Sequence, residues 1–559
     1  MKRDISPLRD QTFDAVVIGG GIHGATVFRQ LAAAGMKVAL IEKDDFGGGT
    51  SANSLKILHS GLRYLQHLNF KRIRESIRSR KYFMQMAPHL IRPMPCIMPT
   101  YGLGIESRPV MAVALALFDL IGCDRNEGAP PENRVGRGRI LSRRECLKIG
   151  PGIRTEGLTG AALWYDDMIL NTERMTLCFI KEAMRHDAAC ANYLEAGRIV
   201  IADREVTGVE VSDRLGEDSF VIHTPLVINA AGPWMGEIQR RSLQLPTTED
   251  LAKAVNIVVD RALFPGYGVG LAGSSDYVDH DAAVKRGKRL FFFAPWQGRT
   301  IIGTTYTYSS GQDSDRSVSE ADINELLREV NTIYPMARLT PEDVIFSHAG
   351  LVPAHRPGSG ERGSANPQMV KHSRVIDHEA QDGLKGLYTL EGVKYTTAPA
   401  IARELETMLK RRAGSGASFT GVPPCRRRHS FAESRLIESL APRFPHIEKV
   451  YGPDCADIFA IIAGDENTGS YLRLEPPLLK AEVIHAVREE MAVTLADVVL
   501  RRTDCGTCGC PARHDLQAIA AVMAGELGWD ETRTAREIDG VAAYYSSVLG
   551  IRGRENPGS

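Results

Sequence analysis

Three glycines and one glutamate near the start of the chain have the types and spacing that bind a dinucleotide. Gly19, Gly21 and Gly24 form the pattern G-x-G-x-x-G, and Glu42 follows 18 residues after the last glycine. Glycines permit a tight turn and let the backbone approach a pyrophosphate, whose charge the N-terminus of a following helix stabilises. A carboxylate at this distance can accept hydrogen bonds from an adenosine ribose.

The elements around these glycines are those that the motif requires. Residues 13–18 are a largely apolar run that predicts a buried strand, residues 25–34 predict an alanine-rich helix ended by Gly35, and residues 37–41 predict a second strand. The elements therefore follow one another in the order that the motif requires: a strand, the glycines, a helix, a second strand and the acidic Glu42. This order predicts a βαβ dinucleotide-binding unit, with a glycine-rich turn in another kind of βαβ unit as the alternative.

The stretch after Glu42 resembles one specific family. Residues 50–65 read T-S-A-N-S-L-K-I-L-H-S-G-L-R-Y-L, which is similar to T-S-x-x-S-x-K-L-I-H-G-G-L-R-Y-L of the FAD-dependent glycerol-3-phosphate dehydrogenases and oxidases. Further similar stretches follow in the family's order: 164–166 (W-Y-D), 229–234 (N-A-A-G-P-W), 293–296 (F-A-P-W), 301–305 (I-I-G-T-T) and 392–397 (G-V-K-Y-T-T). On this resemblance the chain is identified as a divergent member of that family.

The resemblance implies an α/β fold with a Rossmann-like FAD-binding domain, an antiparallel-sheet substrate domain and a helical C-terminal domain. We expect residues 12–75, 195–240 and 340–412 to build the first domain, and residues 76–194 and 241–339 to build the second. Residues 413–418 have linker composition, and residues 420–550 would form the third domain. Apolar spacing in that last region predicts helices over 481–499 and 516–527.

The family's motifs also assign roles to residues of this chain. They imply that FAD contacts Gly19, Gly21, Gly24, Glu42, Ser51, Ser54, Lys56 and Gly232. Oxidation of a secondary alcohol requires that a hydride leaves carbon toward the flavin and that a proton leaves oxygen. By family position, Lys394 and Arg63 are the electrostatic catalytic groups, and Tyr64 and Thr396 orient the substrate.

The proton acceptor is predicted from residue type as well as position. Histidine titrates near neutral pH, so His59 is the first choice as catalytic base and His348 is the second, as a substrate-site residue. A structural role for His59 beside the flavin, bonded to backbone, is the alternative. For Lys394 the alternative is a solvated loop lysine.

Departures from the family fall on the substrate side. Val352 stands where the family has one phosphate-binding arginine, while Arg374 matches the second. Asn256 replaces a histidine near the flavin, and Tyr306 replaces the aspartate of G-T-T-D. We therefore expect a small polyol phosphate as substrate, with an unphosphorylated hydroxy compound or a non-catalytic FAD-binding protein as alternatives. The H-S-G-L-R-Y stretch at 59–64 argues against an amine or amino-acid oxidase.

Composition and charge restrict the partners. The chain has 68 basic and 68 acidic residues, which predicts no general attraction to nucleic acid. The sequence shows no second nucleotide-binding G-x-G-x-x-G that would indicate NAD(P)H, and relatives reoxidise their flavin with quinone or oxygen. The absence of a secretory signal and of an 18-residue apolar stretch predicts a cytoplasmic protein without a transmembrane helix.

Two segments raise the hypothesis of peripheral contact with the inner face of the membrane. Residues 70–81 form a basic amphipathic pattern in which Ile73 and Ile77 share one helix face, and residues 110–118 are strongly apolar. The plainer interpretation of 70–81 is a solvated helix packed on the flavin domain. A homodimer is a further arrangement that the sequence leaves open.

Three cysteines stand close together in the C-terminal region. Cys505, Cys508 and Cys510 have C-x-x-C-x-C spacing, which can bind zinc or iron when a fourth ligand is present. No second C-x-x-C accompanies them. We expect a loop of small residues without metal, with a metal site or a redox thiol as alternatives.

Overall fold

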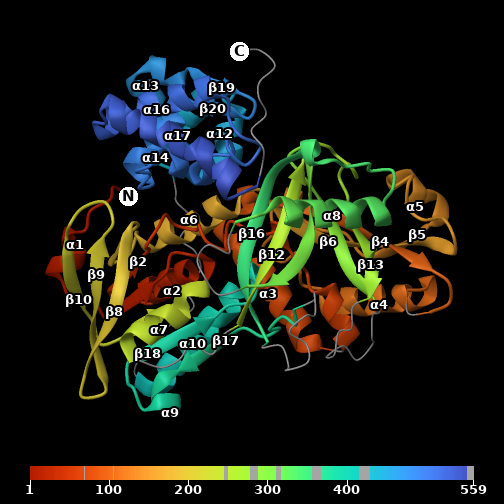
Figure 1. The fold of residues 1–559 in the computed structure, drawn as a ribbon, viewed down its shortest axis with the longest axis horizontal. Coiled ribbons are helices and arrows are strands. Elements are labelled where there is room, and N and C mark those ends of the chain that lie inside the picture. The colour runs from red at the N-terminus through yellow and green to blue at the C-terminus, as the bar shows by residue number, and fades with distance from the viewer. Residues whose placement is uncertain are drawn as a thin grey trace.

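The computed structural model describes residues 1–67, 69–104, 106–243, 250–276, 288–309, 317–355, 367–413 and 429–550. These residues form three parts: a parallel sheet covered on both faces, a large mixed sheet, and a helical domain drawn in blue in Figure 1. In this view the helical domain lies at the upper left, above the parallel sheet. This arrangement confirms the predicted fold class.

A six-stranded sheet forms the centre of the first part. Its order is β17 (Arg374–Asp377), β18 (Leu387–Glu391), β11 (Val227–Asn229), β1 (Ala15–Ile18), β2 (Val38–Ile41) and β7 (Ala188–Ala191). The strands from β18 to β7 are parallel, and β17 is antiparallel to β18. Strands β1 and β2 are buried along their whole length, as expected of a parallel sheet with both faces covered.

Helices cover one face of this sheet and a small sheet covers the other. Side chains of β1 and β2 alternate between the faces, so Val17 and Leu40 pack against helices while Val16 and Ile41 pack on the opposite side. The helices are α2 (Ile22–Ala33), α6 (Thr172–Ala183) and α10 (Ala398–Ala413). The opposite face carries β8 (Leu194–Ala202), β9 (Glu205–Asp213), β10 (Ser219–His223) and α7 (Met235–Leu243). Two short helices, α1 (Ser6–Asp10) and α9 (His378–Asp382), complete this part.

The second part is a mixed sheet. Its order is β16 (Val344–Ala354), β12 (Asp250–Val259), β15 (Arg299–Tyr308), β14 (Lys288–Trp296), β13 (Gly268–Asp276), β4 (Ile91–Tyr101), β6 (Leu158–Ile169) and β3 (Ile57–Leu58), with β5 (Arg139–Ser142) on β6. Only the β13–β4 pair is parallel among these described strands. Helix α8 (Glu320–Ile333) packs on one face, and the C-terminal domain packs on the other. Helices α3 (Phe70–Met86), α4 (Arg108–Ile121) and α5 (Arg143–Ile149) flank the sheet (Figure 1).

Helices α3 and α4 pack against each other through apolar residues. Ile73 and Ile77 of α3 are fully buried against Phe118 of α4. The apolar face of α3 is therefore internal, as the plainer interpretation of 70–81 requires. Within the described residues, no helix combines the length and the apolar character needed to cross a membrane.

The third part is helical, with one hairpin. Its elements are α11 (Phe431–Leu440), α12 (Pro445–Tyr451), α13 (Cys455–Gly464), β19 (Tyr471–Leu474), β20 (Pro477–Leu479), α14 (Lys480–Glu489), α15 (Leu495–Asp497), the π-helical turn η10 (Val498–Arg502), α16 (Arg513–Leu527) and α17 (Glu531–Ser547). The remaining described short turns are η1 (Leu62–His67), η2 (Pro88–Leu90), η3 (Pro131–Asn133), η4 (Gly232–Trp234), η6 (Pro341–Asp343), η7 (Tyr395–Thr397), η8 (Gly452–Asp454) and η9 (Glu466–Gly469).

The structure differs from two expectations about element boundaries. The single helix predicted over 481–499 is wrong, because the chain breaks after Glu489: Met491 has φ +54°, and the Thr494 side chain caps α15. Strand pairing also shifts the predicted domain limits, since β7 and α6 belong with the parallel sheet before residue 195, and β16 belongs to the mixed sheet beyond residue 339. Of the predicted linker, residues 414–418 lie outside the described residues.

Candidate cofactor and substrate site

One cavity of about 700 Å³ lies where the carboxyl ends of β1 and β2 meet the mixed sheet. Ligands of open α/β sheets bind at this edge of the strands. Two groups of lining residues carry the chemistry. The glycine-turn group consists of Gly19, Gly21, Glu42 and Ser51, and the histidine group consists of His59, Tyr64, Arg72 and Lys394.

Two glycines of the turn, Gly19 and Gly24, have no room for a side chain. A Cβ atom on Gly24 would lie 1.9 Å from the Gly19 carbonyl oxygen, and one on Gly19 would lie 2.6 Å from the Ala230 carbonyl oxygen. Gly19 also has φ +107°. Gly24 does not line the cavity itself, but its missing side chain lets α2 begin directly beneath the turn, with its N-terminus at the cavity.

Glu42 follows β2, and its carboxylate is held by backbone groups. Its Oε2 accepts a hydrogen bond from the Gly20 N–H at 2.7 Å, and its Oε1 accepts one from the Asp44 N–H at 2.9 Å. Burial raises the pKa of this carboxyl, while the two hydrogen bonds act in the opposite direction. An acceptor fixed in this way at the cavity wall can receive ribose hydroxyl groups.

The other predicted cofactor residues line the same cavity, and some also hold the backbone. Ser51 Oγ accepts the Ile22 N–H at the start of α2 at 2.9 Å, and Ser54 Oγ accepts the Lys56 N–H at 3.1 Å. The Lys56 amine is directed to Glu173, with N···O distances of 3.2 and 2.9 Å, so it fastens its loop to α6. Gly232 has φ +56° and leaves open space where a Cβ would be.

These features fit the FAD that the family resemblance implies. The glycines of the turn carry no Cβ that could obstruct a pyrophosphate, and the helix N-terminus and Glu42 offer complementary groups for phosphate and ribose. A cavity of about 700 Å³ has the size of a cofactor site. The residues present are therefore suited to an elongated dinucleotide.

In the histidine group, His59 is paired with a buried aspartate. Its Nδ1 lies 3.0 Å from Asp166 Oδ2, and Asp166 Oδ1 accepts hydrogen bonds from the Ser60 N–H and hydroxyl at 2.7 and 2.5 Å. Burial raises the pKa of Asp166, but the hydrogen bond and charge of His59 and the two Ser60 bonds more than offset it, leaving the pKa below its ordinary value. An ionised Asp166 holds the hydrogen on Nδ1 and leaves Nε2 as a proton acceptor.

Two cations converge on the Tyr64 ring. Lys394 Nζ donates to the Tyr64 hydroxyl at 3.0 Å and lies 5.0 Å from the ring centroid. The Arg72 guanidinium lies 5.2 Å from the same centroid, and its Nη2 donates to the Lys371 carbonyl at 2.6 Å. Thr396 lines the cavity beside Lys394, whereas the Arg63 side chain lies outside the described part of the chain.

Two predicted substrate residues lie elsewhere. His348 is buried in β16 beside Phe346, with ring centroids 5.1 Å apart, and neither ring nitrogen has a hydrogen-bond partner among the described residues. Burial and the Lys56 charge lower the pKa of His348 well below its ordinary value. Arg374 points from β17 to Glu391 in an ion pair of 2.7 Å. Neither residue is among the described residues that line the cavity, whereas Val352 is.

Several cavity residues were missed by the motifs. Asp166 lies within the W-Y-D stretch, so its residue type was a usable signal, but its pairing with His59 was not visible in sequence. Thr304 donates its hydroxyl hydrogen to Asn256 Oδ1 at 2.6 Å, and Arg289 also lines the cavity. For Arg289 no sequence signal was available.

The cysteine cluster is embedded in protein. Cys505 and Cys508 are buried, and Cys510 is exposed. Arg473 donates to Cys505 Sγ at 3.1 Å, and Cys508 Sγ donates to Gln297 Oε1 at 3.3 Å. Burial raises the pKa of Cys505 to about 11 and that of Cys508 to about 12, which disfavours reactive thiolates. No set of three metal-ligating side chains is assembled in the described ranges.

Comparison with known proteins adds four findings. A family model described as FAD dependent oxidoreductase matches residues 14–408, and one described as the C-terminal domain of alpha-glycerophosphate oxidase matches residues 429–534. A glycerol-3-phosphate dehydrogenase of Synechocystis sp. is 28% identical over 97% of this chain and 98% of its own length. An aerobic glycerol-3-phosphate dehydrogenase of Staphylococcus saprophyticus is 28% identical over 89% of this chain and 87% of its own.

A solved structure is similar along almost the whole chain. The glycerol-3-phosphate dehydrogenase from Bacillus halodurans complexed with FAD superposes with a TM-score of 0.70 at 22% identity, covering 97% of this chain and 96% of that one. At this identity the similarity establishes the fold. It includes the helical C-terminal domain as well as the two sheets.

Proposed function

Because this chain belongs to the family of FAD dependent oxidoreductases, we propose that it oxidises the secondary alcohol of a small polyol phosphate similar to glycerol 3-phosphate. Membership confirms the predicted cofactor and enzyme class. The substrate class is inferred from the relatives named glycerol-3-phosphate dehydrogenase and from the residues of the histidine group.

One observation carries the proposal: a proton acceptor and an anion-binding group line the same cavity as the glycine turn. His59 with Asp166 supplies the acceptor, and Lys394 with Tyr64 supplies the cation and the orienting hydroxyl. Alcohol oxidation at a flavin needs these two functions from the protein. Bound FAD supplies the hydride acceptor.

The protein's part in the reaction follows from these contacts. Lys394 and the Tyr64 hydroxyl orient the anionic substrate so that its reacting hydroxyl faces His59. His59 takes the hydroxyl proton at Nε2, and the ionised Asp166 stabilises the imidazolium that results. Phe292 packs edge-on against His59, with ring centroids 5.9 Å apart, and limits the ring's rotation.

Other cationic side chains in the cavity can replace the positive charge that is missing at Val352. The cavity wall holds Arg72, Arg289, Lys371 and Lys394. Arg72 is the most suited to phosphate, because it is fixed by the Lys371 carbonyl and the Tyr64 ring and presents a planar fork. This retained charge favours a phosphorylated substrate over an unphosphorylated hydroxy compound.

Anaerobic flavin reduction tests the proposal. The purified protein is mixed without oxygen with glycerol 3-phosphate, tetritol and pentitol phosphates, glycerol and short hydroxy acids, and the flavin absorbance is followed. Bleaching by a polyol phosphate supports the proposal. Bleaching only by unphosphorylated compounds favours the alternative substrate class, and no bleaching by any compound favours a non-catalytic flavoprotein.

A variant at Arg72 tests the substrate's charge. R72M should raise the KM for the phosphorylated substrate by about 10- to 100-fold, the effect of losing one charge-assisted pair. The control is K71M, which removes an exposed lysine next to it on α3 that does not line the cavity. A KM equal to that of the unmodified protein would contradict the assignment of Arg72.

We also propose that α4 contacts a membrane surface from which quinone reoxidises the flavin. Val110, Val113, Leu117 and Leu120 form an exposed stripe on α4, with Val113 and Leu120 70% and 71% exposed. Their spacing of three and four residues places them on one face. Val110 also lines the cavity, so the stripe adjoins the site where reduced flavin would meet an apolar acceptor.

Vesicle binding tests the role of α4. V113D/L120D should abolish cosedimentation with phosphatidylglycerol vesicles, whereas L474D, at a 78% exposed leucine of the C-terminal domain, should not. Absence of binding by the unmodified protein, with oxygen consumed at the rate of turnover, would favour oxygen as acceptor. A dimer that V113D/L120D dissociates would instead assign the stripe to a homodimer contact.

A further inference from the structure

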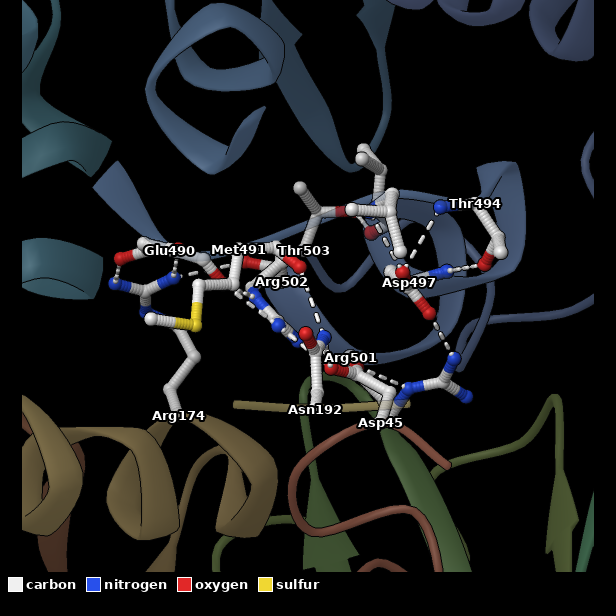
Figure 2. Close-up of polar contacts among 12 residues, drawn as sticks. Asp45, Arg174, Asn192, Glu490, Met491, Thr494, Asp497, Arg501, Arg502 and Thr503 are labelled. Carbon is white, nitrogen blue, oxygen red and sulfur yellow. Dashed lines mark hydrogen bonds and ion pairs between the residues drawn. The ribbon is translucent and has the colours of Figure 1, made fainter. Parts of the chain in front are cut away.

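A buried cluster of ion pairs joins the C-terminal domain to the loop that follows β2 (Figure 2). The fully buried Asp45 side chain lies at its centre. Arg502 binds this carboxylate with both terminal nitrogens, Nη1 to Oδ2 at 2.7 Å and Nη2 to Oδ1 at 2.8 Å. Arg501 Nε donates to Oδ2 at 2.6 Å. Asp45 is thus held by two consecutive arginines that lie more than 450 residues away in sequence.

The C-terminal domain orients these arginines with its own backbone. They end the π-helical turn η10, which directs both side chains to one carboxylate. Arg502 Nε and Nη2 donate to the Glu490 carbonyl at 3.0 and 2.8 Å, and Arg501 Nη2 donates to Asp497 Oδ1 at 2.5 Å. The break after α14 supplies the Glu490 carbonyl, so the interrupted helix contributes directly to the cluster.

The loop that contains Asp45 connects the ion-pair cluster to the cofactor cavity. Lys43, Asp44, Gly47 and Gly49, which flank Asp45, all line the cavity, while the Asp45 side chain is directed into the C-terminal domain. The Gly47 N–H donates to the Gly20 carbonyl at 3.0 Å. The loop therefore lies between the arginines on one side and the glycine turn on the other.

The charges of the cluster are balanced. Asp45 and Asp497 face Arg501 and Arg502, and Asn192 Nδ2 bridges Asp45 Oδ1 to the Met491 carbonyl, with both distances 2.9 Å. Burial raises the pKa of Asp45, but the charges of Arg502 and Arg501 more than offset this and lower it to about 2. Without the arginines, the loop would bury an unpaired carboxylate, which is strongly unfavourable.

We propose that Arg501 and Arg502 are positioning residues for the cofactor: the C-terminal domain holds the loop 43–49 against the bound FAD through Asp45 and so slows release of the cofactor. By linkage, bound FAD then also favours the docked C-terminal domain. The inference rests on FAD binding and is independent of the substrate.

The test measures FAD release from the purified holoprotein. Flavin fluorescence is followed after dilution into an excess of a flavin-binding competitor, at fixed temperature. We expect R502M and D45N to release FAD at least about tenfold faster than the unmodified protein. R501Q removes only one of the three arginine bonds to Asp45, from a partly exposed arginine, and should release FAD about threefold faster.

The matched control is D454N. Asp454 of the C-terminal domain pairs with Lys181 of α6 at 2.6 Å, so this change also weakens docking, but it does not contact the loop. Its FAD release should stay within about twofold of the unmodified rate. The proposal is overturned if R501Q and D45N release FAD at the unmodified rate, or if D454N accelerates release as much as they do. Failure of every substrate to bleach the flavin would leave these rates unaffected.

Discussion

The two groups of residues that line the cavity are built in different ways. In the glycine-turn group, the contacts are made by backbone atoms and by the absence of side chains: Gly24 approaches the Gly19 carbonyl, and Glu42 is held by two backbone N–H groups. In the histidine group, the contacts join side chains from distant segments, such as Lys394 with Tyr64 and His59 with Asp166.

The difference teaches which part of the site can change. A turn that depends on missing Cβ atoms tolerates few substitutions, because a Cβ added at Gly19 or Gly24 meets backbone. A wall of side chains can exchange its members while the main chain stays in place. Val352, Asn256 and Tyr306, the departures from the family, all line the second kind of wall.

The largest effect of a substitution is expected at the glycine turn. A valine in G24V would place Cβ 1.9 Å from the Gly19 carbonyl oxygen and push α2 away from β1, so FAD affinity should fall by at least about 100-fold. The measurement is flavin absorbance of the purified protein and titration with FAD. G540A, in a helix with open space around the glycine, should remain yellow. A yellow, fully loaded G24V would contradict the steric argument.

The next largest effect is expected at Lys394. K394M should lower kcat/KM for the polyol phosphate by about 100- to 1000-fold, because it removes a cation that binds the substrate in the cavity. FAD content should not change. K385M, at an exposed lysine paired with Glu205, serves as control. A K394M protein with kcat/KM within threefold of the unmodified value would show that the lysine is merely solvated.

A smaller effect is expected from the partner of the catalytic histidine. D166N should reduce kcat by about 10- to 100-fold, because a neutral amide neither fixes the His59 tautomer nor stabilises its imidazolium. The acid limb of the kcat profile should also shift in pH, an effect that a purely structural role would not cause. D166E should restore part of the rate. A D166N profile that overlays the original would argue for a structural His59.

The free energy of unfolding should depend on pH through His23 of the glycine turn. Burial lowers the pKa of His23, in the glycine turn, to about 4 from an ordinary value of 6.5. Between these values the unfolded chain binds more protons, so the free energy of unfolding should fall by about 1–3 kcal/mol as the pH decreases from 6.5 to 4. H23Q should flatten this slope in urea unfolding, whereas H514Q, at an exposed histidine, should leave it unchanged. An unchanged slope in H23Q would contradict the lowered pKa of His23.

The smallest effect is expected at Arg374. Its ion pair with Glu391 lies outside the cavity lining, so R374M should change kcat/KM by less than about twofold. Steady-state kinetics with the best polyol phosphate provides the measurement. A loss of kcat/KM of tenfold or more would indicate that Arg374 binds the substrate, as the family pattern implies.

Features that local backbone geometry determines could be predicted from the sequence. The spacing of Gly19, Gly21, Gly24 and Glu42 dictates a turn, a helix start and an acceptor, and the structure places them accordingly. Contacts that depend on tertiary packing could not be predicted from the sequence. The Lys56 amine reaches Glu173 because α6 packs against its loop, which no local pattern reveals.

The same limit applies to residues on regular elements. Arg72 lies on a helix that the sequence predicted, but its position at the cavity depends on how Ile73 and Ile77 rotate α3 against Phe118. Arg374 matched a motif of only a few residues, and the pairing of β17 with β18 then directed it to Glu391. Side-chain direction on such elements follows from tertiary contacts.

The sequence separation between Asp45 and its two arginines has a consequence for synthesis. A ribosome adds about 5–20 residues per second, so Arg501 and Arg502 emerge roughly 20 to 90 seconds after Asp45. During that interval the nascent chain already contains Gly19, Gly21 and Gly24, but the Asp45 carboxylate has no guanidinium partner from the C-terminal domain. If the proposed clamp holds the cofactor, firm retention of the flavin begins only after Arg501 and Arg502 have left the exit tunnel.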